Sequence, residues 1–514
     1  MIKGSIATID TTSRGASQCS RVRVRTALSG FAIAFPTTLA IALGTLAHPA
    51  GAQALPSPIS PLPSAAGREG TLAASAALQT SNLGEAQIEF LLKLAQETQQ
   101  PGRGLPLDVF RERVLGAVVV HPDVLALRAS LASTRESTRE LEAARLPQVS
   151  ARADVASHRS DRSTITGVPK REYETASAGL TLAQHIYDFG VIDSSVLVGQ
   201  ERYAAVQARL DGRRDELALR AVQTWHDVIR SRRLLAQLQL NQQSLENMVG
   251  YLTRRYDLGG GPISDVWRAQ ARLADARASL ASAQVRVRNA EASYREVFDA
   301  APGALDLPVL PNVDRQAIAT GAADLVRDYP AVRSAEASRR AAEQELDLTL
   351  RRERPTVGLE VSAQRRDLVG RGAPGNDVSA SLVLRYSFYS GGADRARAAQ
   401  AAFRAVEATE QVRSITVQVD RALSQAIATE DNAATTLAAR HDGVTLAVQA
   451  LRAVREQFAN RRGSLLDLLN AQDVLHAAGV GLSEAEIDAA LARWQVLYYS
   501  TSYWPLAVAT PVSR

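Results

Sequence analysis

The sequence has almost no cysteine. Among its 514 residues Cys19 is the only one, and it lies before an apolar run that begins at Ala27. A basic segment, an apolar run and a small-residue tail are the parts of a secretory signal peptide, so we expect residues 1–54 to be one. Its removal would leave a chain without disulfides, a cysteine metal site or a cysteine nucleophile. The alternative is an uncleaved membrane anchor, against which the helix breaker Pro36 argues.

Long apolar runs and an excess of charge are also missing beyond residue 54. No stretch of about 18 apolar residues occurs there, so no transmembrane helix is predicted. Residues 1–54 hold five basic residues and one acidic residue, which gives +4 of the formal net charge of +5. The remainder, +1, offers no basic surface for nucleic acid. Any membrane-spanning part of the mature chain must therefore be built from strands.

Motifs for catalysis and for metal binding are absent from the sequence. The seven histidines are scattered, and no two of them lie four residues apart as a helical metal pair would. Gly259, Gly260 and Gly261 precede an expected helix, but no Lys-Ser or Lys-Thr pair follows, which argues against a phosphate loop. No G-x-S-x-G motif occurs. We expect a protein that is not an enzyme and that uses no cofactor or metal.

The most informative feature that is present is an internal duplication. The segment YDLGGGPISD from Tyr256 matches FANRRGSLLD from Phe458, and the same offset of 202 residues pairs Gln270 with Gln472. The helix expected after each segment carries apolar residues at a 3-4-3-4 spacing, which is typical of a coiled coil. These residues are Val266, Ala269, Leu273, Ala276, Leu280, Ala283, Val287, Ala290, Tyr294 and Val297 in the first copy, and Leu468, Ala471, Leu475, Ala478, Leu482, Ala485, Ala489, Ala492, Val496 and Tyr499 in the second. Each copy therefore holds an antiparallel helical hairpin with the matched segment at its tip.

Each copy also contains a pair of segments in which apolar and polar residues alternate. They span 149–155 and 176–182 in the first copy, and 357–363 and 378–388 in the second. This alternation is typical of outer-membrane strands, which have about 10 residues each. A half-buried sheet of a soluble protein is the alternative, but a following helix of about 60 residues, ~90 Å long, does not fit a compact domain. Closed membrane barrels have at least about eight strands, and open sheet edges are unstable in lipid. Four strands per chain therefore predict a homo-oligomer.

The two copies define the expected domain boundaries. In each copy a helix precedes the strands. In the first copy it begins at about Asp108 and has a break near His121-Pro122. In the second it runs from about Ala322 to Arg351, with the matching start near Tyr329-Pro330. The boundaries that follow are 1–54 for the signal peptide, 55–105 for a Pro-rich leader without an assigned fold, 106–301 for the first repeat, 302–321 for a linker, 322–500 for the second repeat and 501–514 for a C-terminal tail.

From about Asp108 to its end, the sequence resembles the TolC family of outer-membrane channel-tunnels. The shared features are the duplication, the two strand pairs, a glycine after each pair and the two hairpin tips. The resemblance implies an α+β membrane protein with long antiparallel coiled-coil helices. Three protomers with four strands each would share a twelve-stranded barrel in the outer membrane of a Gram-negative bacterium. Their helices would continue this barrel as an α-barrel tunnel into the periplasm.

The resemblance also implies the partners. A periplasmic adaptor protein and an inner-membrane ABC or proton-driven exporter would dock at the tips, and outer-membrane lipid would surround the strands. The drug-efflux branch of the family usually has a lipid-attachment cysteine after its signal; none is present here, which favours protein export by type I secretion. A tripartite pump for drugs or small molecules is the alternative. A non-conducting periplasmic coiled-coil scaffold and a secreted adhesin stalk are alternatives from other classes.

In this family the hairpin tips form a gate that is closed at rest. Asp467 matches the first acidic ring of the gate, and Asn470 replaces the acidic residue of the second. The position of the closing arginine is Gly463. The gate residues implied by the resemblance are Asp265, Asp467, Asn470, Arg461 and Arg462. Those implied for adaptor docking are Tyr256, Gly259, Gly260, Gly261, Ile263, Ser264, Phe458, Gly463, Ser464 and Leu465. Helix N-capping is the alternative role for Asp265 and Asp467.

Aromatic residues make up only 5% of the sequence, and six of them lie at the expected strand ends. These six are Tyr173, Tyr187, Phe189, Tyr386, Phe388 and Tyr389. This position suits the aromatic girdle at a membrane interface, and core packing at the junction between strands and helices is the alternative. Arg385 shares its strand face with Ser387, so we expect it to point into the lumen rather than to lipid.

Overall fold

The computed structural model describes the part of the chain that carries the duplication. The described residues are 84–99, 104–160, 171–310, 315–366, 368, 375–460, 462–500 and 504–506. All of them belong to one compact unit, Ala65–Arg514. The predicted signal peptide, Arg461 and most of the predicted C-terminal tail lie outside the described residues.

The order of helices and strands occurs twice along this unit. The first copy comprises α3 (Leu107–Val120), α4 (Pro122–Ala143), β1 (Gln148–Ser160), β2 (Arg171–Tyr187), α5 (Val191–Asp257) and α6 (Ile263–Phe298). The second comprises α7 (Arg315–Asp328), α8 (Pro330–Arg351), β3 (Thr356–Arg366), β4 (Gly375–Arg385), α9 (Ala393–Ala459) and α10 (Leu465–Tyr499). The predicted internal duplication is confirmed. A further helix, α2 (Glu85–Gln99), precedes the first copy and lies in the leader to which the sequence assigned no fold.

Proline divides the helix that precedes each strand pair. Pro122 and Pro330 are the first residues of α4 and α8, and the preceding His121 and Tyr329 are extended, with ψ of 135° and 133°. Proline suits the first helical position because its missing N–H is not needed there, and it disfavours a helical conformation of the residue before it. The break predicted at His121-Pro122 is therefore present. The helix predicted from Ala322 to Arg351 is divided at Pro330 into α7 and α8.

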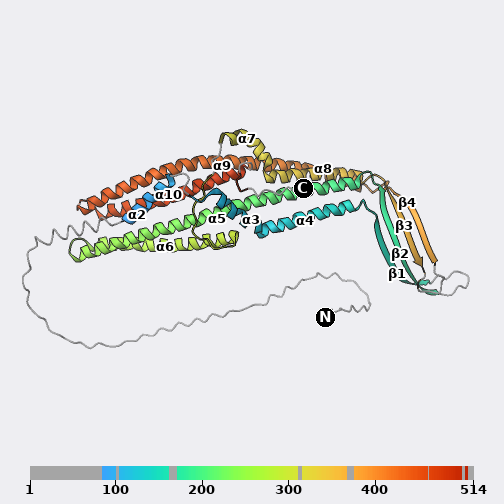
Figure 1. Ribbon diagram of the computed structural model, residues 1–514, viewed down its shortest axis with the longest axis horizontal. Coiled ribbons are helices and arrows are strands. Elements are labelled where there is room, and N and C mark those ends of the chain that lie inside the picture. The colour runs from blue at the N-terminus through green and yellow to red at the C-terminus, as the bar shows by residue number, and fades with distance from the viewer. Residues whose placement is uncertain are drawn as a thin grey trace, which may run out of the picture. The chain divides into compact units, whose positions relative to one another are not determined.

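The two longest helices each turn back into a shorter partner. α5 and α9 have 67 residues each, which corresponds to about 100 Å. α5 packs on α6 and α9 packs on α10, so the predicted hairpins form (Figure 1). Residues of the predicted seams, among them Leu273 in α6 and Leu475 in α10, are buried. The far halves of α5 and α9 pack against α4 and α8.

α10 has a second buried stripe that the heptad pattern did not predict. Its residues again follow a 3-4 spacing and include polar ones: Leu469, Gln472, Gly479, Ser483, Ile487, Ala490, Trp494 and Leu497. This stripe faces α5 and α2 of the same chain. The matching stripe of α6 is exposed; Trp267, for example, corresponds to Leu469 and is 62% exposed. The duplicated helices thus differ in how many sides they bury within one chain.

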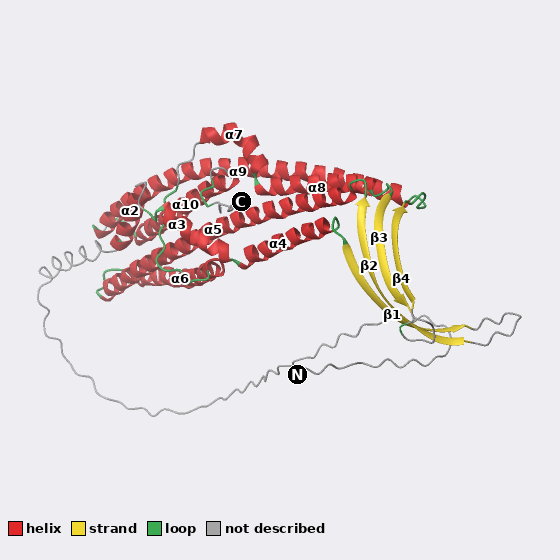
Figure 2. Cartoon of the chain, turned by 45° about the vertical axis from the view of Figure 1, so that its right-hand side comes forward, coloured by secondary structure: helices red, strands yellow, loops and turns green. Residues whose placement is uncertain are grey.

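The four strands form one antiparallel sheet in the order β1-β2-β3-β4, and the β2–β3 pairing joins the two copies (Figure 2). The register places the apolar residues of all strands on one face. Leu182 lies opposite Val149 on one side and Val361 on the other. This face is most exposed on the edge strands, with 68% at Val149 and 71% at Leu382, and it is largely half-buried on β2 and β3. The predicted alternation is therefore confirmed across all four strands.

The other face of the sheet carries a set of polar contacts. Ser177 Oγ donates to Asp154 at 2.7 Å, and the amide of Gln364 donates to Ser177 Oγ at 3.1 Å. Arg385 donates to the Glu360 carboxylate at 2.5 Å. Arg385 therefore lies on the polar face, as the sequence predicts.

The fourth strand is shorter than the sequence suggested. β4 ends at Arg385 and not at Phe388, because Arg385 already pairs with Thr356, the first residue of β3, and no partner residue remains beyond it. Phe388 is 89% exposed and lies 4.6 Å, between ring centroids, from Tyr386. This exposure disagrees with core packing within the protomer as the role of Phe388, whereas Phe189 is half-buried and packs on Tyr187. The side chain of Tyr173 lies outside the described part of the chain.

Among the described residues, no single helix is both long enough and apolar enough to cross a membrane. By length and composition only the pair α3 and α4, bent by 56°, would be sufficient.

A partly buried carboxyl group lies on α5 near its contact with α8. Burial and the neighbouring Asp211 carboxylate raise the pKa of Asp215 to about 7. Arg333 and Arg214 oppose this rise, and both form ion pairs with Asp211, at 3.0 Å and 3.3 Å. Asp215 is therefore a group that ionises near neutral pH in the folded chain.

We expect the variant Asp215→Asn to gain thermal stability relative to the wild type as the pH rises. The folded chain keeps the Asp215 proton up to about pH 7, whereas the unfolded chain loses it near 3.8. The wild type therefore loses stability progressively between these two pH values. Melting curves in detergent at pH 4 to 9 would show the difference in Tm growing up to about pH 7 and then staying constant. Asp324→Asn, at a carboxylate that is 84% exposed, is the control. A difference in Tm that does not change with pH would contradict the assignment.

Candidate functional site at the hairpin tips

The first tip, between α5 and α6, is a tight glycine turn. The N–H of Gly259 donates to Tyr256 O and that of Gly260 to Arg255 O, both at 2.8 Å. Gly259 has a φ of +73°, a left-handed conformation that favours glycine. The Arg255 side chain closes the turn by donating from Nε to Gly260 O at 2.8 Å. Three consecutive glycines therefore serve the turn, in agreement with the sequence argument against a phosphate loop.

The second tip, between α9 and α10, is closed by a capping box. Ser464 Oγ accepts from the N–H of Asp467 at 3.1 Å, and the Asp467 carboxylate accepts from the N–H of Ser464 at 3.3 Å. The N–H groups of Arg462 and Gly463 both donate to Gln457 O. Asp467 thus satisfies free backbone groups at the start of α10, as the capping alternative predicted.

Asp265 differs from Asp467 although the two occupy matching positions. The N-cap residue of α6 is Pro262, and no side-chain hydrogen bond caps this helix. The Asp265 carboxylate lies 3.7 Å from Arg268, and its side chain is 22% exposed. A capping role is therefore present at Asp467 and absent at Asp265, where the negative charge is only loosely paired.

The residues expected to form a docking surface divide into buried and exposed groups. Phe458 is only 6% exposed, packs on Tyr251 and has the Arg255 guanidinium 5.6 Å from its ring centroid. Leu465 is 5% exposed, whereas the matching Ile263 is half-buried. Phe458 and Leu465 therefore build the core beneath the tips.

The outer surface of the tips combines apolar and polar side chains. Tyr256, which matches Phe458 in the duplication, is 43% exposed, and Leu258 beside it is 71% exposed. Leu466 and Trp267 extend this surface, with 52% and 62% exposure. Gly261 and Ser264 are half-buried, and Ser464, Asp467, Asn470 and Arg462 are exposed.

Polar side chains also connect the two hairpins. Gln237 on α5 donates to Ser483 Oγ of α10 at 2.6 Å, and Gln472 on α10 donates to Ser244 Oγ of α5. Beside Gln472, Asp473 on α10 lies 3.2 Å from Arg272 on α6. Sequence reasoning treated Gln472 only as a repeat of Gln270. The signal that it missed was the second 3-4 stripe of α10, on which Gln472 lies.

One ionisable group of this region is largely buried on α10. Burial lowers the pKa of His476 on α10, so its ring is neutral near pH 7. Among the described residues no cluster of three His, Cys, Asp or Glu side chains is placed to hold a metal ion. The tips present a mixed surface of apolar and polar side chains, with acidic residues near the turns and an apolar core beneath.

Comparison with known proteins identifies the family of this architecture. Residues 117–297 match the family model for outer membrane efflux proteins. The chain is 27% identical over 336 residues to the outer membrane efflux protein BepC of Brucella suis, over 64% of this chain and 73% of BepC. It is 23% identical over 411 residues to the outer membrane protein TolC of Vibrio cholerae, over 73% of this chain and 86% of TolC. The chain belongs to the TolC family.

Other members of the TolC family agree with this assignment. The proteases secretion protein PrtF of Dickeya chrysanthemi is 23% identical over 353 residues, which cover 66% of this chain and 74% of PrtF. The solved structure of the outer membrane protein VceC of Vibrio cholerae has the same fold, with a TM-score of 0.66 and 16% identity over 76% of this chain and 96% of VceC. As a TolC-family member, the chain is an outer-membrane protein of the efflux and secretion channels, which are not enzymes.

Proposed function

We propose that three copies of this chain form a duct that exports a substrate across the periplasm and the outer membrane. The observation that carries this proposal is the sheet. Its apolar face is exposed on β1 and β4 and largely half-buried on β2 and β3, and β1 and β4 are edge strands within the described sheet. Open edges cannot be placed in lipid, so other copies must supply the missing strands. Three copies give the twelve strands of the family's barrel.

The proposed cargo is a protein, delivered by an inner-membrane ABC exporter and a periplasmic adaptor. PrtF, named for the secretion of proteases, supports this cargo. A pump for small molecules is the second candidate, supported by BepC, whose name is that of an efflux protein. Comparing the secreted proteins and the dye sensitivity of cells with and without the gene separates the two. Loss of a secreted protein with unchanged dye sensitivity supports type I secretion, and the reverse result supports efflux of small molecules.

The proposed gate lies at the tips, where Asp467 of three copies would surround the duct axis with Asp265, Asn470, Arg461 and Arg462 nearby. The exposed surface of Tyr256, Leu258 and the glycine turn is the proposed docking site of the adaptor. Three carboxylates around an axis favour cations, so we expect small, cation-selective openings in planar bilayers.

Two substitutions of Asp467 separate its charge from its capping role. Asp467→Asn removes the charge but keeps an oxygen that accepts from the Ser464 N–H, whereas Asp467→Ala removes both. We expect both variants to lose cation selectivity in single-channel recordings. If Asp467→Asn keeps the selectivity of the wild type, Asp467 acts as a helix cap and not as a gate. A purified protein that stays in solution without detergent and never conducts would refute the duct and support a scaffold.

A further inference from the structure

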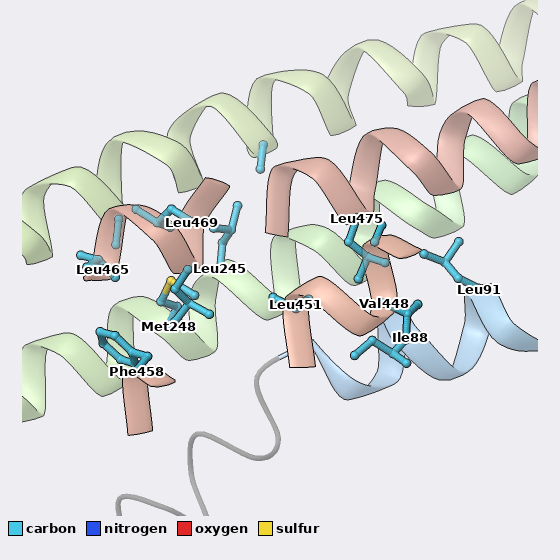
Figure 3. Close-up of a cluster of buried hydrophobic side chains, with 14 of the residues drawn as sticks. Ile88, Leu91, Leu245, Met248, Val448, Leu451, Phe458, Leu465, Leu469 and Leu475 are labelled. Atoms are coloured by element: carbon cyan, nitrogen blue, oxygen red, sulfur yellow. The ribbon is translucent and has the colours of Figure 1, made fainter. Parts of the chain in front are cut away.

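Helix α2 stands outside the duplication. No helix corresponds to it between α6 and α7 in the residues that the structure describes there. One face of α2 is deeply buried: Ile88, Leu91, Leu94 and Ala95 are 0%, 1%, 4% and 6% exposed. These side chains belong to the same apolar cluster as residues of α5, α9 and α10 near the tips (Figure 3). α2 is therefore an integral part of the packing that supports the entrance.

Gly479 in α10 leaves the space into which Leu91 of α2 packs. A Cβ at Gly479 would lie 2.9 Å from Leu91 Cδ1 and 3.3 Å from Leu91 Cγ, so any larger residue would displace Leu91. The matching residue of the first copy is Arg277, whose side chain instead pairs with Glu246 at 3.0 Å. Only the second hairpin can therefore accept α2.

The start of α2 is attached to α9. Glu85 pairs with Arg455 at 2.9 Å and lies 3.9 Å from Arg452. Gly84, just before the helix, lies against Ser244 of α5. A Cβ added to Gly84 would lie 3.4 Å from the hydroxyl oxygen of Ser244. α2 thus contacts α9 and α10 of the second hairpin and α5 of the first.

The interface that α2 bridges has polar contacts beside its apolar ones. α5 and α10 share the apolar cluster that contains Leu245 and Leu469, and the Gln237–Ser483 and Gln472–Ser244 hydrogen bonds also join them. The amide oxygens of Gln237 and Gln472 are buried and accept no hydrogen bond from the described residues. A buried acceptor without a partner lowers the stability of an interface. The apolar face of α2 therefore adds to the direct contacts that hold α5 and α10 together here.

We propose that α2 is a strap that keeps the entrance closed by holding the second hairpin against α5, and that opening requires its release from α10. This rests on the proposed function, because only a duct with its entrance at the tips gives the contact a role in gating. The strap is local to the chain, so it acts in each of the three protomers.

The first test unseats α2 with Gly479→Arg, which introduces the residue type found at position 277. Displacing Leu91 removes a buried apolar contact of α2, so we expect the ratio of open to closed channels in planar bilayers to rise about tenfold or more. The matched control is Gly443→Arg on α9, where a Cβ would meet nothing within 4 Å. Equal gating of Gly479→Arg, Gly443→Arg and the wild type would overturn the strap.

The second test locks α2 in place without depending on a disruptive change. Leu91 Cγ lies 3.3 Å from the Cβ position of Gly479, which suits a disulfide in the variant Leu91→Cys/Gly479→Cys. We expect the oxidised channel to stay in its small-conductance state and the reductant to restore opening about tenfold or more in the same bilayer. Identical opening before and after reduction would overturn the strap while leaving the duct intact. A wild-type protein that never conducts would overturn the duct, and the strap with it.

Discussion

Replacing Trp225 by alanine is expected to lower the free energy of unfolding by about 3–5 kcal/mol, because a large buried side chain would leave a cavity. Trp225 on α5 is 0% exposed. Its ring meets Phe110 of α3 edge-on at 5.2 Å and lies 6.0 Å from Tyr294 of α6. Its Nε1 donates to Asp306 O, in the segment between the two copies, at 2.9 Å. A single side chain thus joins three parts of the chain.

Thermal and urea unfolding in detergent would measure this effect. Trp267→Ala on α6 is the matched control, because the same residue type is 62% exposed there. We expect the control to change the stability by less than about 0.5 kcal/mol in the isolated protomer. If both alanine variants unfold alike, the aromatic cluster does not hold α3, α5 and α6 together as the structure indicates.

The second large effect is expected when an arginine is placed on the apolar face of strand β4. Leu382→Arg places a charge on the apolar face of β4, whereas Ser381→Arg places the same charge one residue earlier on the polar face. If the apolar face contacts lipid, the first substitution costs about 2–4 kcal/mol near the bilayer centre and the second costs little. We expect Leu382→Arg to reduce strongly the amount of trimer in outer-membrane fractions and Ser381→Arg to leave it near the wild-type level.

Comparing these two variants shows whether only the apolar face of β4 rejects a charge, as contact with lipid requires, or whether the strand rejects a charge on both faces. Leu382 is 71% exposed in the protomer, so an arginine at this position has room and would be harmless in water. Equal amounts of trimer from both variants would therefore refute the assignment of this face to lipid. Loss of both would show that β4 accepts no charge on either face.

Sequence periodicity predicted the parts of the fold that depend on local patterns. The heptad seam of α6 and the two-residue alternation of β4 each follow from which side of one element is apolar, and both appear in the structure. The register between strands, which the sequence analysis did not predict, keeps one apolar face continuous across the sheet.

Features that depend on packing between distant segments were not predictable in this way. α2 has no partner in the duplication, so nothing in the repeat pointed to its seat on Gly479. At the tips, matching positions diverged: Phe458 is buried and Tyr256 exposed, and Asp467 caps a helix that Asp265 does not. The N-cap residue decides the last difference, because Ser464 offers a hydroxyl acceptor and Pro262 does not. The gate and docking roles of these residues remain predictions from the resemblance.

The β2–β3 pairing has a consequence for the order in which the chain folds. β1 and β2, and likewise β3 and β4, are neighbours in sequence, so each hairpin closes a short loop. β2 meets β3 only after α5, α6, α7 and α8 have been made, and such long-range contacts form slowly. During this interval the first hairpin carries two unpaired edges, which are prone to mispairing with other chains. Synthesis of the second copy therefore sets the time for which the first hairpin needs protection from aggregation.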